Sequence, residues 1–188
     1  MRTKYASPQI FLHWLIFILV VCTYASMELK GFVPKGTPGR EYFNLSHYSL
    51  GFSILVLMVV RLLVKTMYVT PAIMPPEPNW QRLAAIGAHA LIYLMFISLP
   101  VLGILSMYYS GKEWLLFGVK MPQSVVPDVI LQKQLKGLHE LIANTGYYLI
   151  GLHAAAALFH HYVLRDNALL RMMPGKTKQN FDRPPSGQ

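Results

Sequence analysis

The sequence predicts an all-α integral membrane protein built as a bundle of four transmembrane helices. The 188-residue chain is 54% hydrophobic and only 13% charged, whereas soluble domains carry about 25% charged residues. Four apolar stretches also have the length that a helix needs to cross a bilayer, which is about 20 residues. These stretches are residues 10–27, 45–64, 83–108 and 137–164.

The first stretch, IFLHWLIFILVVCTYASM, follows Arg2 and Lys4 and therefore also resembles a secretory signal peptide. It is long for the apolar region of a signal peptide, and TYAS matches a cleavage site only loosely. We therefore expect a retained span. The second stretch contains LGFSILVLMVV. The third contains Pro100, which we expect to kink its helix.

A single domain accounts for the chain, because no Ser/Gly-rich linker divides it. We expect residues 1–174 to form the membrane domain and residues 175–188 to form a polar, disordered cytoplasmic tail. Cys22 is the only cysteine, which excludes a disulfide framework and a C-x-x-C-H haem attachment site. Any haem would have to be held without covalent bonds.

The Lys and Arg residues predict the orientation, because cytoplasmic loops carry more of them than external loops. With the N-terminus in the cytoplasm, ten face inward and seven face outward, so we expect both termini in the cytoplasm. The inner ones are Arg2, Lys4, Arg61, Lys65, Arg82, Arg165, Arg171, Lys176, Lys178 and Arg183. The outer ones are Lys30, Lys35, Arg40, Lys112, Lys120, Lys133 and Lys136.

The histidines are the strongest functional signal, because an ionisable residue inside a membrane helix is costly. In the fourth stretch, positions His139, Gly146, His153 and His160 follow one another at intervals of seven. Seven residues are nearly two helical turns, so these positions share one stripe of the helix. His139 and His153 would lie about 21 Å apart along the axis. Two stacked haems need about that separation, and Gly146 would leave room between them.

Partner ligands for these histidines are expected at matching depths on other helices. His13 lies at the depth of His153, and His47 lies at the depth of His139, so two bis-histidine pairs can form in the bundle core. His89 lies toward the same end as His13, and spacing alone leaves a His13–His89 pair open. Zinc is disfavoured because no acidic or thiolate ligand accompanies the histidines. A proton relay and scattered structural roles are the alternatives to two haems.

Long blocks of the chain carry a family resemblance. They are QIFLHWLIF, SILVLMVVRLL, GAHALIYLMFISLPVLG, LHELIANTGYYLIGLHAAAALFHHY and DNALLRMMP, and together they extend from about residue 5 to residue 174. In these blocks the sequence resembles the bacterial cytochrome b561 family, and particularly the superoxide oxidases (superoxide:ubiquinone oxidoreductases) of enteric bacteria.

The resemblance implies a four-helix bundle in the bacterial inner membrane that holds two non-covalent b-type haems. The family's iron ligands match His13, His47, His139 and His153, which leaves His89 without an iron. The resemblance also implies oxidation of superoxide to O2 on the periplasmic side and electron transfer through both haems to ubiquinone. His160 would then hydrogen-bond to a quinone carbonyl. The alternative places His160 in the headgroup region, as is common for polar side-chain tips.

The basic outer loops are a second functional signal. They contain seven Lys and Arg residues but only five acidic residues, so their net charge is positive. A positive surface accelerates the capture of a small anion such as superoxide. The partners are then superoxide, ubiquinone and the lipid bilayer, and neither a protein partner nor nucleic acid is required. Basic loops also suit anionic lipid or a partner protein. Two other functions therefore stay open: a quinone-linked electron-transfer subunit for a periplasmic dehydrogenase or hydrogenase, and a non-redox membrane carrier.

Overall fold

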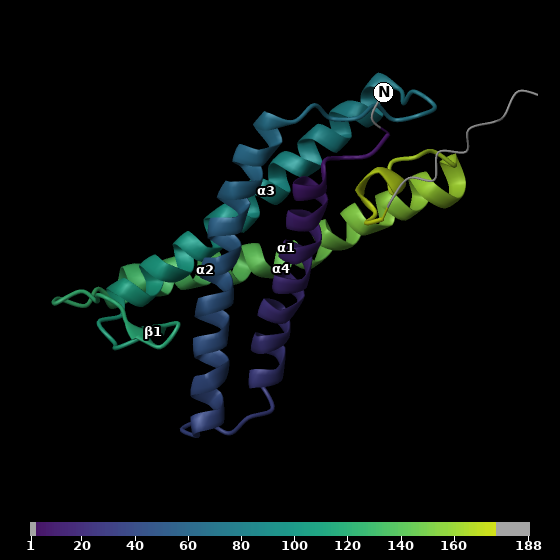
Figure 1. Cartoon of the computed structure of the whole chain (residues 1–188). Helices are drawn as coiled ribbons and strands as arrows, with labels where there is room; N and C mark the ends of the chain where they lie inside the picture. Colours follow the sequence, from purple (N-terminus) through teal and green to yellow (C-terminus); the bar gives the residue numbers. More distant parts are fainter. Residues whose placement is uncertain (1–2, 176–188) are drawn as a thin grey trace, which may run out of the picture.

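A computed structural model describes residues 3–175 of the chain. Four long helices dominate the fold (Figure 1). They are α1 (Ser7–Lys30), α2 (Pro38–Met67), α3 (Asn79–Tyr109) and α4 (Val129–Phe159). The short elements are the strands β1 (Leu115–Leu116) and β2 (Val119–Lys120), the π-helix η1 (His160–Leu164) and the 3-10 helix η2 (Leu170–Met172). The polar tail expected from residue 175 lies, apart from Gly175 itself, outside the described residues.

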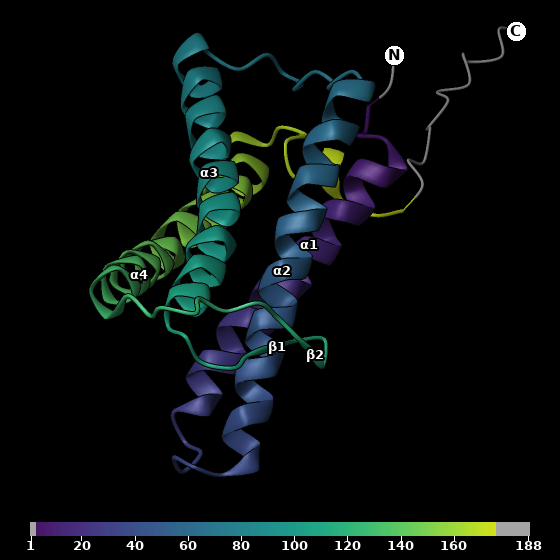
Figure 2. The same cartoon turned by 90° about the vertical axis from the view of Figure 1, so that its left-hand side faces the viewer.

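The four helices form two pairs, α1 with α2 and α3 with α4, which cross at an angle (Figure 1, Figure 2). The two pairs are joined chiefly by packing of α2 against α3. Lys4 and Gly175 lie at the same end of the bundle, where the Lys4 Nζ donates a hydrogen bond to the Gly175 carbonyl (3.0 Å). We call this the terminal end. The opposite end, with the loop 31–37 and the β1–β2 hairpin, is the hairpin end.

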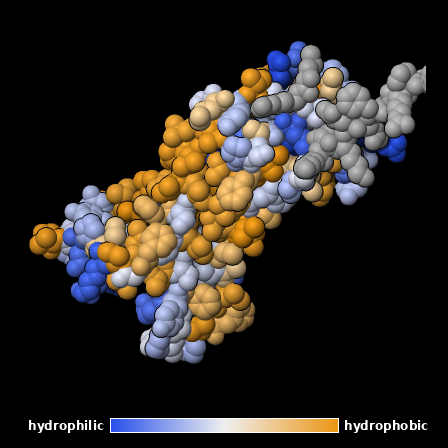
Figure 3. Space-filling model, in the orientation of Figure 1, coloured by the Kyte–Doolittle hydropathy of each residue, from blue (hydrophilic) through white to orange (hydrophobic). Residues whose placement is uncertain are grey.

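The face of the bundle seen in Figure 3 is apolar over much of its length. Large apolar side chains such as Phe11, Leu94 and Leu141 are more than half exposed. All four helices are long and apolar enough to cross a membrane, and in a bilayer these side chains face lipid. The protein is therefore a multi-pass membrane protein with a four-helix bundle, as the sequence predicts.

The helices α1, α2 and α3 extend beyond their predicted apolar stretches at both ends, whereas α4 begins eight residues before its stretch and ends at Phe159, with η1 covering the rest to Leu164. At the start of α4, the Asp128 side chain accepts a hydrogen bond from the Leu131 N–H (2.9 Å) and so caps the helix. The third helix continues through Pro100 to Tyr109 as one element. The first helix contributes buried side chains to the bundle core like the second and third.

A core layer at the middle of the bundle holds the helix pairs together. Gly146 is the only buried residue of α4, and a Cβ there would lie 2.5 Å from the Tyr24 Oη and 3.0 Å from the Met95 Sδ. The Tyr24 hydroxyl also donates a hydrogen bond to the Ala143 carbonyl (2.9 Å). The other buried members are Ile16, Val20, Ile54, Met58, Met95, Phe96 and Leu99.

The expectation that Gly146 leaves room between two haems is therefore wrong. The space beside it is filled by Tyr24 and Met95. The missing side chain instead allows α4 to approach its neighbours closely, which is the usual role of small residues between membrane helices.

The β1–β2 hairpin is an element that the apolar pattern does not predict. Phe117 and Gly118 at its turn both have positive φ angles (51° and 82°), as a two-residue type I′ turn requires. The Phe117 N–H donates to the Ser49 Oγ of α2 (2.9 Å), and Trp114, just before β1, is buried. The hairpin therefore folds back over α2. Its register pairs Leu115 with Lys120 and Leu116 with Val119.

Because Gly146 lies against Tyr24 and Met95, Gly146→Ala should destabilise the bundle relative to Gly151→Ala. A Cβ at Gly151 would meet nothing within 4 Å, so both changes gain helix propensity and only the first overpacks the core. Overpacking costs about 1–3 kcal/mol. Thermal unfolding of both variants in detergent, followed by circular dichroism, measures the difference. Equal melting temperatures would contradict a close contact at Gly146.

Candidate functional site

His47 on α2 and His139 on α4 face each other toward the hairpin end. Their ring centroids are 6.1 Å apart and their ring planes meet at 73°. The His139 Nδ1 lies 2.9 Å from the Leu99 carbonyl, and the His47 Nδ1 lies 3.4 Å from the Thr23 carbonyl. A carbonyl oxygen only accepts hydrogen bonds, so each Nδ1 carries the proton and each Nε2 keeps a lone pair for a metal ion.

A cavity of about 1640 Å³ lies beside this pair and is lined by both histidines. It exceeds the volume of about 300–1,000 Å³ that is typical of ligand pockets. Two glycines widen it: a Cβ at Gly51 would meet nothing within 4 Å, and one at Gly103 would meet only the His139 ring, at 3.5 Å. The cavity therefore has room for a large planar cofactor beside the two imidazoles.

The wall of this cavity includes aromatic residues that the sequence analysis does not single out. Trp114 lies edge-on to Tyr48, with ring centroids 6.0 Å apart, and Tyr48 lies next to His47 at 6.1 Å. Both aromatic residues line the cavity. The only signal in the sequence is the aromatic block EWLLFGVK, and it becomes informative only once the hairpin folds over α2.

His13 on α1 and His153 on α4 form a second facing pair, toward the terminal end. Their ring centroids are 6.4 Å apart and their planes meet at 70°. The His13 Nδ1 is buried and has no hydrogen-bond partner among residues 3–175. A buried polar atom without a partner is costly, so this site fits one that a bound group completes.

His89 lies beside the second pair. Its ring centroid is 5.4 Å from that of His153, and its Nδ1 lies 2.6 Å from the carbonyl of Ala85 on its own helix. The separations of His13 from His153 (6.4 Å) and of His47 from His139 (6.1 Å) are similar, and the ring of His89 lies closer to that of His153 than the ring of His13 does.

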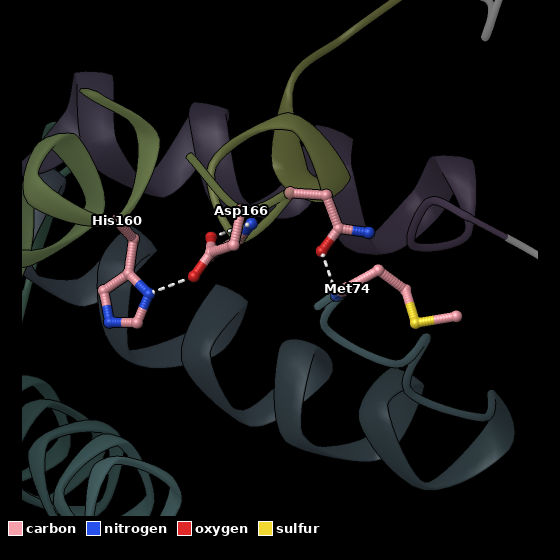
Figure 4. Close-up of polar contacts among 5 residues, drawn as sticks. Met74, His160 and Asp166 are labelled. Carbon is pink, nitrogen blue, oxygen red and sulfur yellow. Dashed lines mark hydrogen bonds and ion pairs between the residues drawn. The ribbon is translucent and has the colours of Figure 1, made fainter. Parts of the chain in front are cut away.

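His160 has a partner that the sequence analysis does not predict. Its Nδ1 lies 2.5 Å from the Oδ2 of Asp166 (Figure 4). The Nδ1 of His160 therefore has a partner within the chain, and Nε2 is the nitrogen left for a ligand. Asp166 follows six residues later, a spacing at which side chains of a regular helix do not meet, so helical periodicity gives no signal for this pair.

A sharp reversal of the chain after His160 brings Asp166 back to it. His160 keeps α-helical backbone angles (φ −57°, ψ −42°), so it stays on the stripe of His139 and His153. The following turn widens into the π-helix η1, and Arg165 adopts a left-handed conformation (φ 54°) with its N–H bonded to the His160 carbonyl. Single π-turns of this kind are frequent at functional sites.

The segment 166–173, which follows this reversal, is hydrogen-bonded to the α2–α3 loop at the terminal end. Asn167 bonds to the backbone of Met74 in the α2–α3 loop: its Oδ1 accepts from the Met74 N–H (2.9 Å), and its N–H donates to the Met74 carbonyl (3.3 Å). Arg171 is 8% exposed and donates a hydrogen bond to the Pro71 carbonyl of the same loop. Asp166 is thus held in position by contacts that do not involve His160.

The basic residues of the hairpin end are partly balanced by acids. Lys120 pairs with Glu113 (3.1 Å), and Lys136 pairs with Glu140 (3.2 Å). Four lysines and four glutamates line the cavity, so its wall carries no excess positive charge. These residues are Lys30, Lys112, Lys133, Lys136, Glu28, Glu41, Glu113 and Glu140. Any attraction of an anion to this cavity therefore depends on lysines that form no ion pair with a neighbouring glutamate among the described residues.

Four membrane-spanning helices with facing histidine pairs inside the bundle are typical of membrane-bound b-type cytochromes. Comparison with known proteins agrees with this class. The family model for prokaryotic cytochrome b561 matches residues 4–175. The chain therefore belongs to the prokaryotic cytochrome b561 family, and it is a haem b protein with a role in electron transfer.

Individual relatives match almost the whole chain. It is 47% identical over 177 residues to the probable superoxide oxidase CybB of Yersinia pestis, which covers 94% of this chain and 99% of that protein. It is 46% identical over 171 residues to cytochrome b561 homolog 1 of Escherichia coli, covering 91% and 97%. Cytochrome b562 of Cereibacter sphaeroides is 31% identical over 173 residues, covering 90% and 94%.

Proposed function

We propose that the protein is a superoxide:ubiquinone oxidoreductase of the bacterial inner membrane. The observation that carries the proposal is the presence of two facing imidazole pairs toward opposite ends of one membrane-spanning bundle. Such an arrangement suits electron transfer from one side of a membrane to the other. The similarity to a probable superoxide oxidase supports superoxide as the electron donor.

Two non-covalent b-type haems would be held by these pairs, one by His47 and His139 and the other by His13 and His153. Haem b supplies reversible one-electron exchange at its iron. The chain's own contribution is to fix the imidazoles: the carbonyls of Leu99 and Thr23 orient the rings of the first pair. Such second contacts set the tautomer of a histidine ligand and its ring orientation.

The excess of Lys and Arg on one side of the predicted spans supports an orientation with both termini in the cytoplasm. The hairpin end then faces the periplasm, where superoxide gives up one electron and leaves as O2. The terminal end faces the cytoplasm, where ubiquinone accepts two electrons and takes up two protons from water, so two superoxide molecules are consumed for each quinol. His160, on the same stripe as His139 and His153, would bind a quinone carbonyl there.

The overall proposal is tested with the purified chain in mild detergent. A reduced-minus-oxidised spectrum of a b-type cytochrome, together with superoxide consumption that depends on added ubiquinone, is the expected result. A haem spectrum without any superoxide consumption would instead favour a subunit that serves a periplasmic dehydrogenase or hydrogenase. The absence of a haem spectrum would contradict both functions.

Ligand substitution should remove haems one at a time. His47→Ala or His139→Ala should remove the haem toward the hairpin end, and His13→Ala or His153→Ala the other, each leaving one haem per chain in a pyridine haemochrome assay. His89→Ala is the control and should retain two. Loss of a haem in His89→Ala with both retained in His13→Ala would reverse the assignment of these two residues.

Capture of superoxide should depend on the lysines of the cavity wall that are not in a local ion pair among the described residues. Lys112→Gln with Lys133→Gln should lower the bimolecular rate of haem reduction by superoxide. The rate of the unmodified protein should fall as salt rises, because charges are screened over about 8 Å at physiological ionic strength.

The control for charge is Lys35→Gln, compared with Lys112→Gln and Lys133→Gln made singly, because Lys35 does not itself line the cavity although its neighbours Gly36 and Thr37 do. Stopped-flow absorbance in the haem bands measures the rates. An equal effect of Lys35 and of the wall lysines would indicate only a general surface field, and no effect of salt would rule out electrostatic steering.

His160→Leu should separate haem reduction from quinone reduction. Both haems should be retained, and superoxide should still reduce them rapidly in a first turnover. Steady turnover with ubiquinone should fall, because the residue that holds the quinone carbonyl is lost. The adjacent His161→Leu is the control and should behave like the unmodified protein. Equal quinone-dependent turnover in His160→Leu and the unmodified protein would place the quinone elsewhere.

A further inference from the structure

Asp166 and His160 form a carboxylate–imidazole pair at the terminal end that no step described so far requires (Figure 4). The Asp166 carboxylate is buried, with a side-chain exposure of 6%, whereas the His160 side chain is 20% exposed. One carboxylate oxygen meets the His160 Nδ1 at 2.5 Å, and the other accepts a hydrogen bond from the Ala168 N–H at 2.8 Å. The carboxylate is therefore fixed in position and aimed at the imidazole.

The two hydrogen-bonding positions of His160 then have a defined chemistry. A carboxylate only accepts hydrogen bonds, so the Nδ1 must carry a proton. A quinone carbonyl is also only an acceptor, so a ligand of this kind bound at Nε2 requires a second N–H. A neutral imidazole has only one N–H, and only the imidazolium has both.

We propose that Asp166 is a positioning residue for quinone binding: it holds His160 as an imidazolium whose Nε2–H points to a quinone carbonyl. This inference rests on the proposed function, because it takes ubiquinone to bind at His160. The negative carboxylate favours the positive ring, and a hydrogen bond between charged partners is stronger than one between neutral partners. Asp166 acts through His160 and does not itself touch the quinone.

The surrounding structure explains why the carboxylate stays in place whether or not a quinone is bound. The left-handed turn at Arg165 directs the chain back toward His160. Asn167, the next residue after Asp166, is tied by two hydrogen bonds to Met74 in the α2–α3 loop. The pair is thus built from the end of α4 and the segment after it, and the α2–α3 loop supports it.

The test compares Asp166→Asn with Asn167→Ala. The first change keeps the size of the side chain and removes its charge, so His160 loses the partner that favours the imidazolium. The analogous change in a catalytic triad preserves geometry while imposing the wrong tautomer. The second change loosens the same segment by removing the hydrogen bond between the Asn167 side chain and the Met74 N–H. It leaves Asp166 and His160 intact, so it controls for a purely structural effect.

Two readouts are used on the haem-loaded protein. The first is the 15N NMR spectrum of histidine-labelled, reduced protein, with the His160 signals assigned from their loss in His160→Leu. Two protonated nitrogens are expected in the unmodified protein and in Asn167→Ala, and one in Asp166→Asn. The second is steady turnover with ubiquinone, where Asp166→Asn should raise the KM for quinone about tenfold, which corresponds to about 1.4 kcal/mol. First-turnover haem reduction by superoxide should be unchanged.

The possible results are distinguishable. A singly protonated His160 in the unmodified protein would overturn the proposal, as would an unchanged KM in Asp166→Asn when His160→Leu impairs quinone turnover. An equal rise in KM in Asp166→Asn and Asn167→Ala would reduce Asp166 to a structural role and also overturn it. If His160→Leu leaves quinone turnover intact, the quinone site of the proposed function fails, and the role of Asp166 in quinone binding fails with it.

Discussion

Imidazoles inside an apolar bundle need partners, and the rest of the structure depends on this constraint. A bilayer offers no water to polar groups, so they must be satisfied within the protein or by what it binds. The helices meet the constraint by facing His47 with His139 and His13 with His153. The buried His13 Nδ1 has no hydrogen-bond partner among the described residues, so they do not satisfy every polar atom of the site.

The helix α4 is the common support of both ends. It carries one member of each pair and His160 on one stripe, so its regular backbone sets the distances between the sites. The contact of Gly146 with Tyr24 and Met95 anchors this helix at mid-height. A rigid spacing of this kind suits the proposed electron transfer, because it keeps the separation of the sites constant.

The two ends differ in a way that matches different ligands. Toward the hairpin end a wide cavity, whose wall carries equal numbers of lysines and glutamates, has room for a large planar cofactor. At the terminal end the segment 166–173 lies against the α2–α3 loop and presents one oriented imidazole. That arrangement suits a ligand recognised through a carbonyl group, and it assigns to Asp166 a task that helix packing alone does not need.

The sequence by itself determined the four helices and the candidate pairs, because both depend on local periodicity. The length of an apolar stretch indicates a membrane span. Intervals of seven residues or multiples of seven place His139, His153 and His160 on one stripe of the helix, independently of how the neighbouring helices pack. The depth of each histidine in the membrane also followed from its position along its span, and this depth indicated which histidines can pair. The ligand roles of the paired histidines stay predictions.

Only the tertiary structure decided what lies beside each of these residues. The filling of the space at Gly146, the hairpin that places Trp114 against Tyr48, and the return of Asp166 to His160 all depend on chain reversals and helix crossings. These contacts join residues whose spacing has no helical period, or residues far apart in the chain. Their partners are therefore set by the packing of the whole bundle, which periodicity within a single segment does not encode.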